Sequence, residues 1–196
     1  MIEEAVEGIQ HRIAARLHDL RSRRGLSLEA LAALSGVSRS MISLIERGES
    51  SPTAVVLEKL ATALDMSLAA LFESPRVDAL PIARYADQEP WKDPGSGYVR
   101  RNVSPPSFPS PIRIVEVSFP ARARVAYETG ARGATIHQQV WVLDGSIDVT
   151  VGADRHRLAT GDCLALGLDR PVVFHNPHRR RARYAVVLVS CPDPGR

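Results

Sequence analysis

The chain has 196 residues, which allows one or two domains, and 44% of them are hydrophobic, as in ordinary globular proteins. Its net charge of +3 is too small for a chain that binds nucleic acid indiscriminately through overall charge. With only two cysteines, the chain can form neither a disulfide framework nor a four-cysteine zinc site. No apolar run is long enough to span a membrane, so we expect a cytoplasmic protein.

Five groups of apolar residues near the start of the chain recur with the period of an α-helix. The groups run from Ile9 to Leu20, Leu28 to Ala32, Val37 to Ile45, Leu57 to Leu64 and Leu68 to Phe72. Five amphipathic helices of this kind can bury one small core. The pattern therefore predicts an all-helical N-terminal domain over residues 9–73.

Two of these helices are predicted to be joined by a sharp turn. Ser27 and Ser38 each precede a run of helix-forming residues, where a hydroxyl can accept a hydrogen bond from a free backbone N–H group. Between the runs, Gly36 can take the left-handed conformation that ends one helix and turns the chain. Residues 27–49 are therefore predicted to form a helix, a turn and a second helix.

The second helix of this pair has a polar face that suits the DNA major groove. Four polar residues lie largely outside its apolar stripe, namely Arg39, Ser40, Ser43 and Arg47. Short hydroxyls and arginines are the groups that contact base edges and phosphates in a groove. Residues 9–48 hold seven arginines and three acidic residues, which concentrates positive charge there. The alternative is a plain helical bundle whose serines are caps and whose arginines are solvated.

Residues 9–73 resemble the Xre family of helix-turn-helix domains, the Cro and phage-repressor type. The resemblance rests on Leu31-Ala32, Gly36-Val37-Ser38, Ile42-Ser43, Ile45-Glu46-Arg47-Gly48 and Ser51-Pro52. In that family an arginine of the first helix pairs with the glutamate that ends the recognition helix, which implies an ion pair between Arg21 and Glu46. The resemblance also implies phosphate contacts from the start of the first motif helix and from the loop after the recognition helix.

The resemblance predicts binding to double-stranded DNA as a homodimer that contacts two half-sites. Leu44 departs from the family pattern, because it occupies a position that is often polar and faces DNA. It either touches a thymine methyl group or is simply an exposed apolar residue. The residues expected at the DNA are Ser27, Leu28, Ser38, Arg39, Ser40, Ser43, Leu44, Arg47 and Ser51.

A proline-rich stretch follows the helical domain. Eight of the fourteen prolines lie between Pro75 and Pro111, which excludes a long helix there. We expect residues 74–96 to form a linker or arm, part of which is held against the next domain by aromatic side chains such as Trp91.

Residues 97–191 are predicted to form an all-β domain. Apolar and polar residues alternate in six segments, which cover 112–119, 136–143, 146–151, 162–166, 172–174 and 183–189. Short turns containing Gly, Asp and Pro separate these segments. The pattern is typical of an antiparallel barrel or sandwich.

Three motifs of this part, in residues 140–149, 158–162 and 174–177, resemble a cupin, which is a small barrel built as a double-stranded β-helix. The expected fold class is therefore a two-domain α + β protein, with a five-helix DNA-binding domain and a C-terminal cupin barrel. An Xre domain joined to a cupin resembles bacterial one-component regulators, in which the barrel senses a small molecule.

The usual metal ligands of a cupin are missing. The family uses two histidines, then a glutamate seven residues before a turn glycine, then a third histidine. Here Gln138 takes the glutamate position, Val172 takes the third histidine position, and residues 132–134 contain no histidine. His137 and His175 fall one residue away, on the opposite strand face, unless the register is shifted. We therefore expect neither a metal ion nor a cofactor.

A barrel of this kind suits a small organic ligand that is oriented by few hydrogen bonds. The ligand-binding candidates are Gln138 and, for an anionic group, Arg100, Arg113 and Arg132, which are otherwise surface arginines. We find no catalytic triad and interpret Cys163 as a small buried residue.

The sequence thus predicts a DNA-binding transcriptional regulator whose cupin domain senses a small molecule and contributes to dimerisation, rather than an enzyme. Two alternatives stay open. One is a metal-dependent cupin enzyme fused to a DNA-binding domain, and the other is an antitoxin-like interaction protein whose barrel binds a protein partner.

Overall fold

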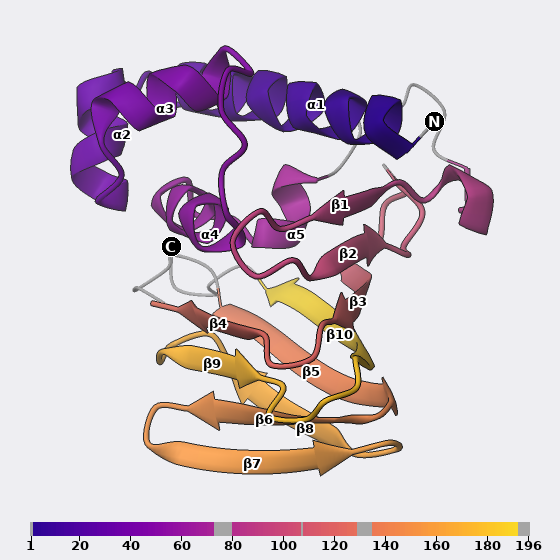
Figure 1. Ribbon diagram of the computed structural model, residues 1–196. Coiled ribbons are helices and arrows are strands. Elements are labelled where there is room, and N and C mark those ends of the chain that lie inside the picture. Colours follow the sequence, from indigo (N-terminus) through magenta and orange to yellow (C-terminus); the bar gives the residue numbers. More distant parts are fainter. Residues whose placement is uncertain (1, 73–79, 107, 129–134, 192–196) are drawn as a thin grey trace.

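The computed structural model describes residues 2–72, 80–106, 108–128 and 135–191. Its helices are α1 (Ile2–Arg23), α2 (Leu28–Ser35), α3 (Arg39–Glu46), α4 (Ala54–Ala63) and α5 (Leu68–Leu71). The five predicted helices are confirmed. Figure 1 shows them as a helical part at one end of the molecule, with α4 and α5 lying between the other helices and the β part.

Local sequence explains where these helices begin. Each of α2, α3, α4 and α5 follows a Ser or Thr whose hydroxyl accepts a hydrogen bond from the backbone N–H three residues later. The four capping residues are Ser27, Ser38, Thr53 and Ser67. Gly36 has a φ of 67°, so it ends α2 in the left-handed conformation and lets α3 start in a new direction.

The axes of α2 and α3 are bent by 114° relative to each other, within the range of about 90–120° for helix-turn-helix units. These two helices pack with α1 and α4 on an apolar cluster formed by Leu17, Leu31, Val37, Ile42, Ile45, Leu60 and Leu64. Within the described residues, no single helix is long and apolar enough to cross a membrane. The helices α2 and α3 reach the required length and apolar composition only when they are taken together, and that pair is bent.

The β part consists of two antiparallel sheets. The six-stranded sheet has the order β1 (Pro90–Lys92), β2 (Val99–Asn102), β3 (Ile112–Phe119), β10 (Ala182–Cys191), β5 (Thr135–Asp144) and β8 (Cys163–Gly167). The four-stranded sheet has the order β4 (Arg124–Tyr127), β9 (Val172–His175), β6 (Ser146–Val151) and β7 (Asp154–Ala159). This is a cupin-like fold, so the predicted fold class and all six predicted strands are confirmed.

A glycine makes the turn where the chain leaves one sheet for the other. Gly145 stands between β5 and β6 with a φ of 80°. A Cβ atom there would lie 3.2 Å from the backbone of both Arg181 and Ala182. The glycine of the cupin motif is therefore required by backbone conformation and by space.

Four strands lack a sequence pattern that predicts them, namely β1, β2, β4 and β7. In β7 only Leu158 is buried, so the apolar alternation that marks a strand is absent. β1 starts with Pro90, which an edge strand tolerates at its first residue. This strand and the 3-10 helix η1 (Tyr85–Asp87) fall in the predicted linker 74–96, of which residues 74–79 lie outside the described residues. Because β1 pairs with β2, a β domain that starts near Pro90 instead of residue 97 fits this sheet better.

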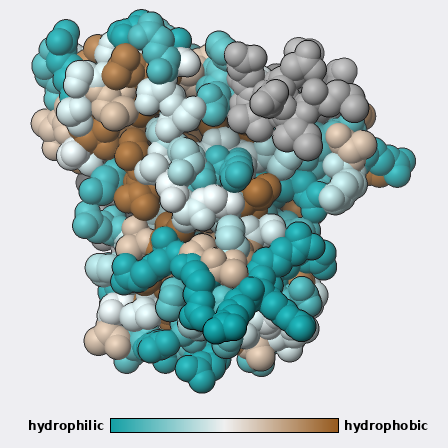
Figure 2. Space-filling view, viewed as in Figure 1, coloured by the Kyte–Doolittle hydropathy of each residue, from teal (hydrophilic) through white to brown (hydrophobic). Residues whose placement is uncertain are grey.

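The helical and β parts share one hydrophobic core. A single cluster of buried residues joins Ile9 and Leu57 of the helices to Val117 and other residues of the sheets. At its centre the rings of Phe72 and Trp91 meet edge to face, with centroids 5.1 Å apart, and Trp91 is only 2% exposed. On the face seen in Figure 2 the surface of the β part is mostly hydrophilic, whereas hydrophobic atoms gather over the helical part and at the junction.

A buried carboxylate fixes the junction of the two parts. Asp93, which follows β1 and is 3% exposed, accepts a hydrogen bond of 2.8 Å from the backbone N–H of Ala54 at the start of α4. Its second oxygen accepts hydrogen bonds of 2.7 Å from the backbone and the hydroxyl of Ser96. A negative charge at a helix N-terminus is favourable, because free N–H groups and the helix dipole point at it.

We predict that Asp93→Ala destabilises the whole chain by about 2–3 kcal/mol, because it leaves buried N–H donors without an acceptor. Chemical denaturation of the full chain measures this change. Asp154→Ala, at an exposed position on β7, is the matched control and should change the unfolding free energy by less than about 0.5 kcal/mol. Equal effects of the two substitutions would contradict the role given to Asp93.

Candidate nucleic-acid interface and ligand cavity

α3 presents a polar face to solvent on the side opposite the helical core. Ile42 and Ile45 are buried in that core, whereas Arg39, Ser40 and Met41 are exposed. Met41 was not among the residues expected at the DNA, although its place beside Ser40 on the exposed face puts it at the same surface. The exposed face is the part of α3 that can enter a groove.

The remaining residues expected at the DNA lie around this face. Ser27, Ser38, Arg47 and Ser51 are exposed, and Leu28, Ser43 and Leu44 are half-buried. The hydroxyls of Ser27 and Ser38 accept hydrogen bonds from Ala30 and Met41 at the starts of α2 and α3. These two serines therefore hold the helix starts in place.

Both arginines of this surface are paired with carboxylates that the sequence pattern did not point to. Arg39 lies 2.5 Å from Glu29 of α2, and Arg47 lies 2.7 Å from Glu49 while also donating to the hydroxyl of Ser43. The hydrogen bonds from Arg47 lower the pKa of the Glu49 carboxyl. All of these charged groups are exposed, and exposed pairs of this kind contribute little, so a phosphate can replace the carboxylates.

A bidentate ion pair holds the far end of α3 against α1. The guanidinium of Arg21 donates two hydrogen bonds of 2.7 Å to the carboxylate of Glu46, and a third to the carbonyl of Leu26. His18 lies 3.0 Å from the same carboxylate. The side chains of Arg21 and Glu46 are only 13% and 6% exposed. The structure thus brings together the two residues for which the sequence implied an ion pair.

Burial of the Glu46 carboxyl opposes its ionisation, but the hydrogen bonds from Arg21 and His18 outweigh this effect, so the pKa of Glu46 lies below its ordinary value. A lowered carboxyl pKa contributes stability above the pKa of the unfolded chain, and that contribution is lost as the pH falls through the folded-state pKa. The pair is therefore fully formed at neutral pH.

A second feature is a cavity inside the barrel, called the barrel cavity below. Its walls on the barrel side include Arg100, Tyr127, Gln138, Val172, Phe174 and Tyr184. Helix α4 contributes Glu58, and the start of α5 contributes Ser67 to Ala69. Gln138 and Val172, the residues in the predicted ligand positions, therefore both face the cavity. The sequence did not predict that the aromatic residues and the residues of α4 and α5 line this cavity, because they come from distant segments of the chain.

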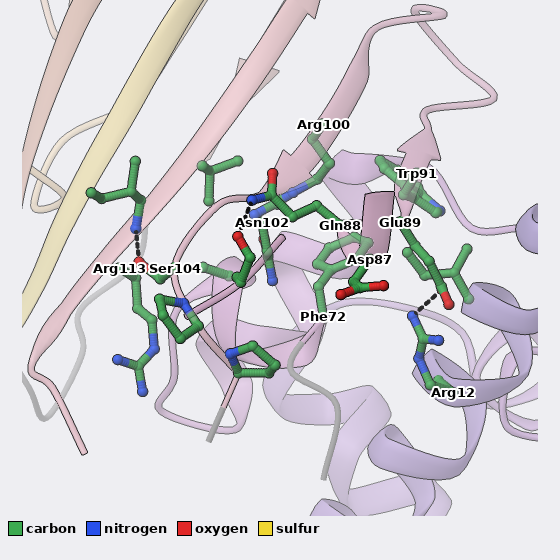
Figure 3. Close-up of a pocket in the computed structure, with 17 residues that line it drawn as sticks. Arg12, Phe72, Asp87, Gln88, Glu89, Trp91, Arg100, Asn102, Ser104 and Arg113 are labelled. Carbon is green, nitrogen blue, oxygen red and sulfur yellow. Dashed lines mark hydrogen bonds and ion pairs between the residues drawn. The ribbon is translucent and has the colours of Figure 1, made fainter. Parts of the chain in front are cut away.

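The four ligand candidates do not all meet in this cavity. Arg100 and Gln138 line it, and Arg132 lies outside the described residues. Arg113 lines a neighbouring cavity between the helical and β parts, where it donates hydrogen bonds to the carbonyls of Ser110 and Ile112. Figure 3 shows Arg113 at the opposite side of that second cavity from Arg12 of α1. Arg113 is thus not a residue of the barrel cavity.

The barrel cavity does not offer the ligand set of a metal site. Gln138 and Val172 supply an amide and a hydrocarbon where metal-binding cupins have a glutamate and a histidine. His137 is exposed and His175 is half-buried, and neither lines the cavity. Within the described ranges, no three His, Cys, Asp or Glu side chains are grouped in a way that could hold a metal ion.

Cys163 is exposed, so the interpretation of this residue as buried is wrong. It begins β8, the edge strand of the six-stranded sheet, opposite Trp141 of β5. Leu164 and Leu166 pack against the core from the other face of the strand, and the strand alternation turns Cys163 outward. Its sulfur lies 4.0 Å from the side-chain oxygen of Gln139, which makes no catalytic pair.

The HTH_3 helix-turn-helix family matches residues 17–71, from the middle of α1 to the end of α5. Residues 17–71 are an Xre-type helix-turn-helix domain. Over 87% of this chain, 28% of residues are identical to the HTH-type transcriptional regulator SutR of Escherichia coli (strain K12), with 90% of that protein covered. The HTH-type transcriptional regulator PuuR of the same organism is 28% identical over 82% of this chain, with 85% of that protein covered.

A solved structure extends this similarity to the β domain. The crystal structure of an HTH_3 family transcriptional regulator from Vibrio cholerae matches 93% of this chain with a TM-score of 0.74 and 27% identity, and 97% of that chain is covered. The helix-turn-helix domain and the β domain together therefore have the architecture of an HTH-type transcriptional regulator.

We predict that Arg21→Met lowers the unfolding free energy of the full chain by about 3 kcal/mol, since it leaves the nearly buried Glu46 charge in the helix-turn-helix domain with only His18. Arg23→Met is the matched control, because Arg23 forms an exposed pair with Asp19 on the same helix and should cost less than about 0.5 kcal/mol. Denaturant titration measures both. A loss no larger than that of the control would show that the pair is solvated.

Proposed function

We propose that the chain is a sequence-specific DNA-binding transcriptional regulator whose cupin barrel senses a small molecule. The observation that carries this proposal is α3, which follows a 114° turn and presents Arg39 and Ser40 on the side away from the core. A helix with short hydroxyls and arginine on its exposed face at such a turn is the arrangement that reads the major groove.

In this proposal the exposed residues of α3 contact bases and the residues around it hold the backbone. Arg39, Ser40 and Ser43 are assigned to base edges, where an arginine forms a bidentate contact with guanine. Arg47 and Ser27, which are both exposed, are assigned to phosphates. On binding, a base edge replaces Glu29 as the partner of Arg39, and a phosphate replaces Glu49 as the partner of Arg47. The two released carboxylates are exposed, so water solvates them and little free energy is lost.

We further infer that the regulator acts as a homodimer in the cytoplasm, where its DNA is. Two helix-turn-helix domains related by a two-fold axis contact half-sites about 10 base pairs apart. The similarity to proteins named as HTH-type transcriptional regulators, along most of their length, supports the assignment of the chain as a transcriptional regulator.

The cavity supports a sensing role for the barrel. Its lining combines aromatic and aliphatic side chains with a few polar groups, which is the composition typical of small-molecule sites. A metal-dependent enzyme would need ligands at the positions of Gln138 and Val172, and neither side chain is a suitable ligand for a divalent ion. We therefore favour a sensor over an enzyme.

We predict that the full chain binds a duplex from the region upstream of its own gene more tightly than a scrambled duplex of equal length, measured by gel shift at physiological salt. Arg39→Ala should weaken binding to the cognate duplex by about 1–3 kcal/mol and reduce the preference over the scrambled one. Arg124→Ala, an exposed arginine on β4, is the control and should leave both affinities unchanged. Equal affinity of the unaltered chain for both duplexes would contradict the proposed function.

A further inference from the structure

Arg100 is a buried arginine that forms no ion pair with any residue that the structure describes. Its side chain in β2 is 5% exposed, and its Nε atom has no hydrogen-bond partner. Among the residues that the structure describes, none accepts a hydrogen bond from its guanidinium or forms an ion pair with it, and the guanidinium carbon lies 4.2 Å from the centre of the Phe72 ring. A buried cation without an anion is unfavourable, so this position calls for an anionic partner.

The guanidinium borders both of the cavities described above. Figure 3 shows Arg100 near Phe72 and Trp91 in the cavity between the helical and β parts. On the barrel side, burial raises the pKa values of Tyr98, Tyr127 and Tyr184, and the positive charge of Arg100 acts in the opposite direction on all three. This electrostatic effect places its charge close to the three tyrosines of the barrel cavity.

Apart from Glu58 of α4, the remaining walls of the barrel cavity are uncharged, and its barrel side is largely aromatic. The rings of Phe174 and Tyr184 stack with centroids 5.6 Å apart, and the hydroxyls of Tyr98 and Tyr127 lie 3.2 Å from each other. These walls offer flat apolar surfaces together with neutral hydroxyls, and Gln138 adds one amide. They suit a ligand that has an apolar body and a single anionic group.

We propose that Arg100 binds the carboxylate of a small organic acid, whose apolar body lies between Tyr127, Phe174 and Tyr184 in the barrel cavity. The fork of a guanidinium matches the two oxygens of a carboxylate, which makes arginine suited to this anion. The proposal rests on the sensing role given to the barrel above, and it adds the chemical class of the ligand and the way in which the ligand acts.

The same acid would act on DNA binding through the helical wall of the cavity. Residues 67–69 of α5 and Glu58 of α4 line the space, and α4 packs directly against α2 of the helix-turn-helix domain. A ligand held between Arg100 and these helices stabilises one position of α4 relative to the barrel. Binding of the acid then changes the affinity for DNA by a certain factor, and binding of DNA changes the affinity for the acid by the same factor.

The test uses phenylacetate and hexanoate, each paired with its neutral amide, in calorimetric titrations of the full chain without DNA. We expect at least one acid to bind at least about tenfold more tightly than its amide, because only the acid pairs with Arg100. Absence of binding by both acids at about 10 mM, or equal binding of each acid and its amide, would overturn the proposal. This comparison needs no variant, so it does not depend on whether a substitution at Arg100 folds.

Substitutions then assign the effect to Arg100. R100M should abolish the preference for the acid, R100K should keep part of it, and the exposed control R124M should keep all of it. A preference that survives in folded R100M would overturn the assignment.

In gel shifts, the binding acid should change the affinity of the unaltered chain for its cognate duplex several-fold, and an unchanged affinity would overturn the coupling. Intact DNA binding without acid binding refutes this inference alone, whereas loss of specific DNA binding refutes the proposed function.

Discussion

The hydrophobic surface shared by the helices and the barrel is the constraint on which the rest of the structure depends. A helical domain of about 60 residues buries too little surface to be more than marginally stable by itself. Here α4 uses two faces, because Leu60 packs in the helix-turn-helix core while Leu57 packs in the core that extends into the sheets. The burial of Trp91 against Phe72 then fixes how the two domains lie. The orientation of the DNA-facing surface is thus determined by the barrel.

Polar contacts make this orientation specific. Asp93 holds the N-terminus of α4, and two ion pairs bridge the same junction, Arg12 with Glu89 at 2.6 Å and Lys59 with Glu128 at 3.0 Å. Apolar burial alone is not directional. A carboxylate that accepts hydrogen bonds from the first N–H groups of a helix fixes the position of the helix start. Helix α4 is therefore held at its start by the β domain, contributes Glu58 to the wall of the barrel cavity, and supports α2. It is the element through which events in the barrel can reach the DNA.

The sequence predicted the parts of the molecule that depend on local patterns. The caps at Ser27 and Ser38, the turn at Gly36 and the strand alternation at Gln138 all follow from interactions within a few residues, and the structure has them. The edge strand β7 could not be predicted, because its side chains face solvent and leave no apolar period. Cys163 was placed wrongly for a related reason, since alternation alone does not say which face of an edge strand is covered.

The candidate site was less predictable, because its contacts join distant segments. The pairing of Arg39 with Glu29, and of Arg47 with Glu49, depends on where α2 and the loop after α3 lie in space. Arg100 and Arg113 could not be told apart in the sequence, and Arg132 lies outside the described residues. Burial, together with the lack of an ion pair with any described residue, singles out Arg100 from Arg113. Such properties arise from the assembled fold and have no local signal.

The central claim is that the helix-turn-helix domain and the barrel form one cooperative unit. The most direct test is equilibrium unfolding of the full-length Trp141→Phe variant, in which the buried Trp91 is the one remaining tryptophan. Guanidinium chloride unfolding is followed with two probes, namely the circular dichroism of the helices and the fluorescence of Trp91. A shared core predicts that both signals change in one transition with the same midpoint. Loss of the helical signal at a lower denaturant concentration than the Trp91 signal would show that the helices unfold independently, and would contradict the claim.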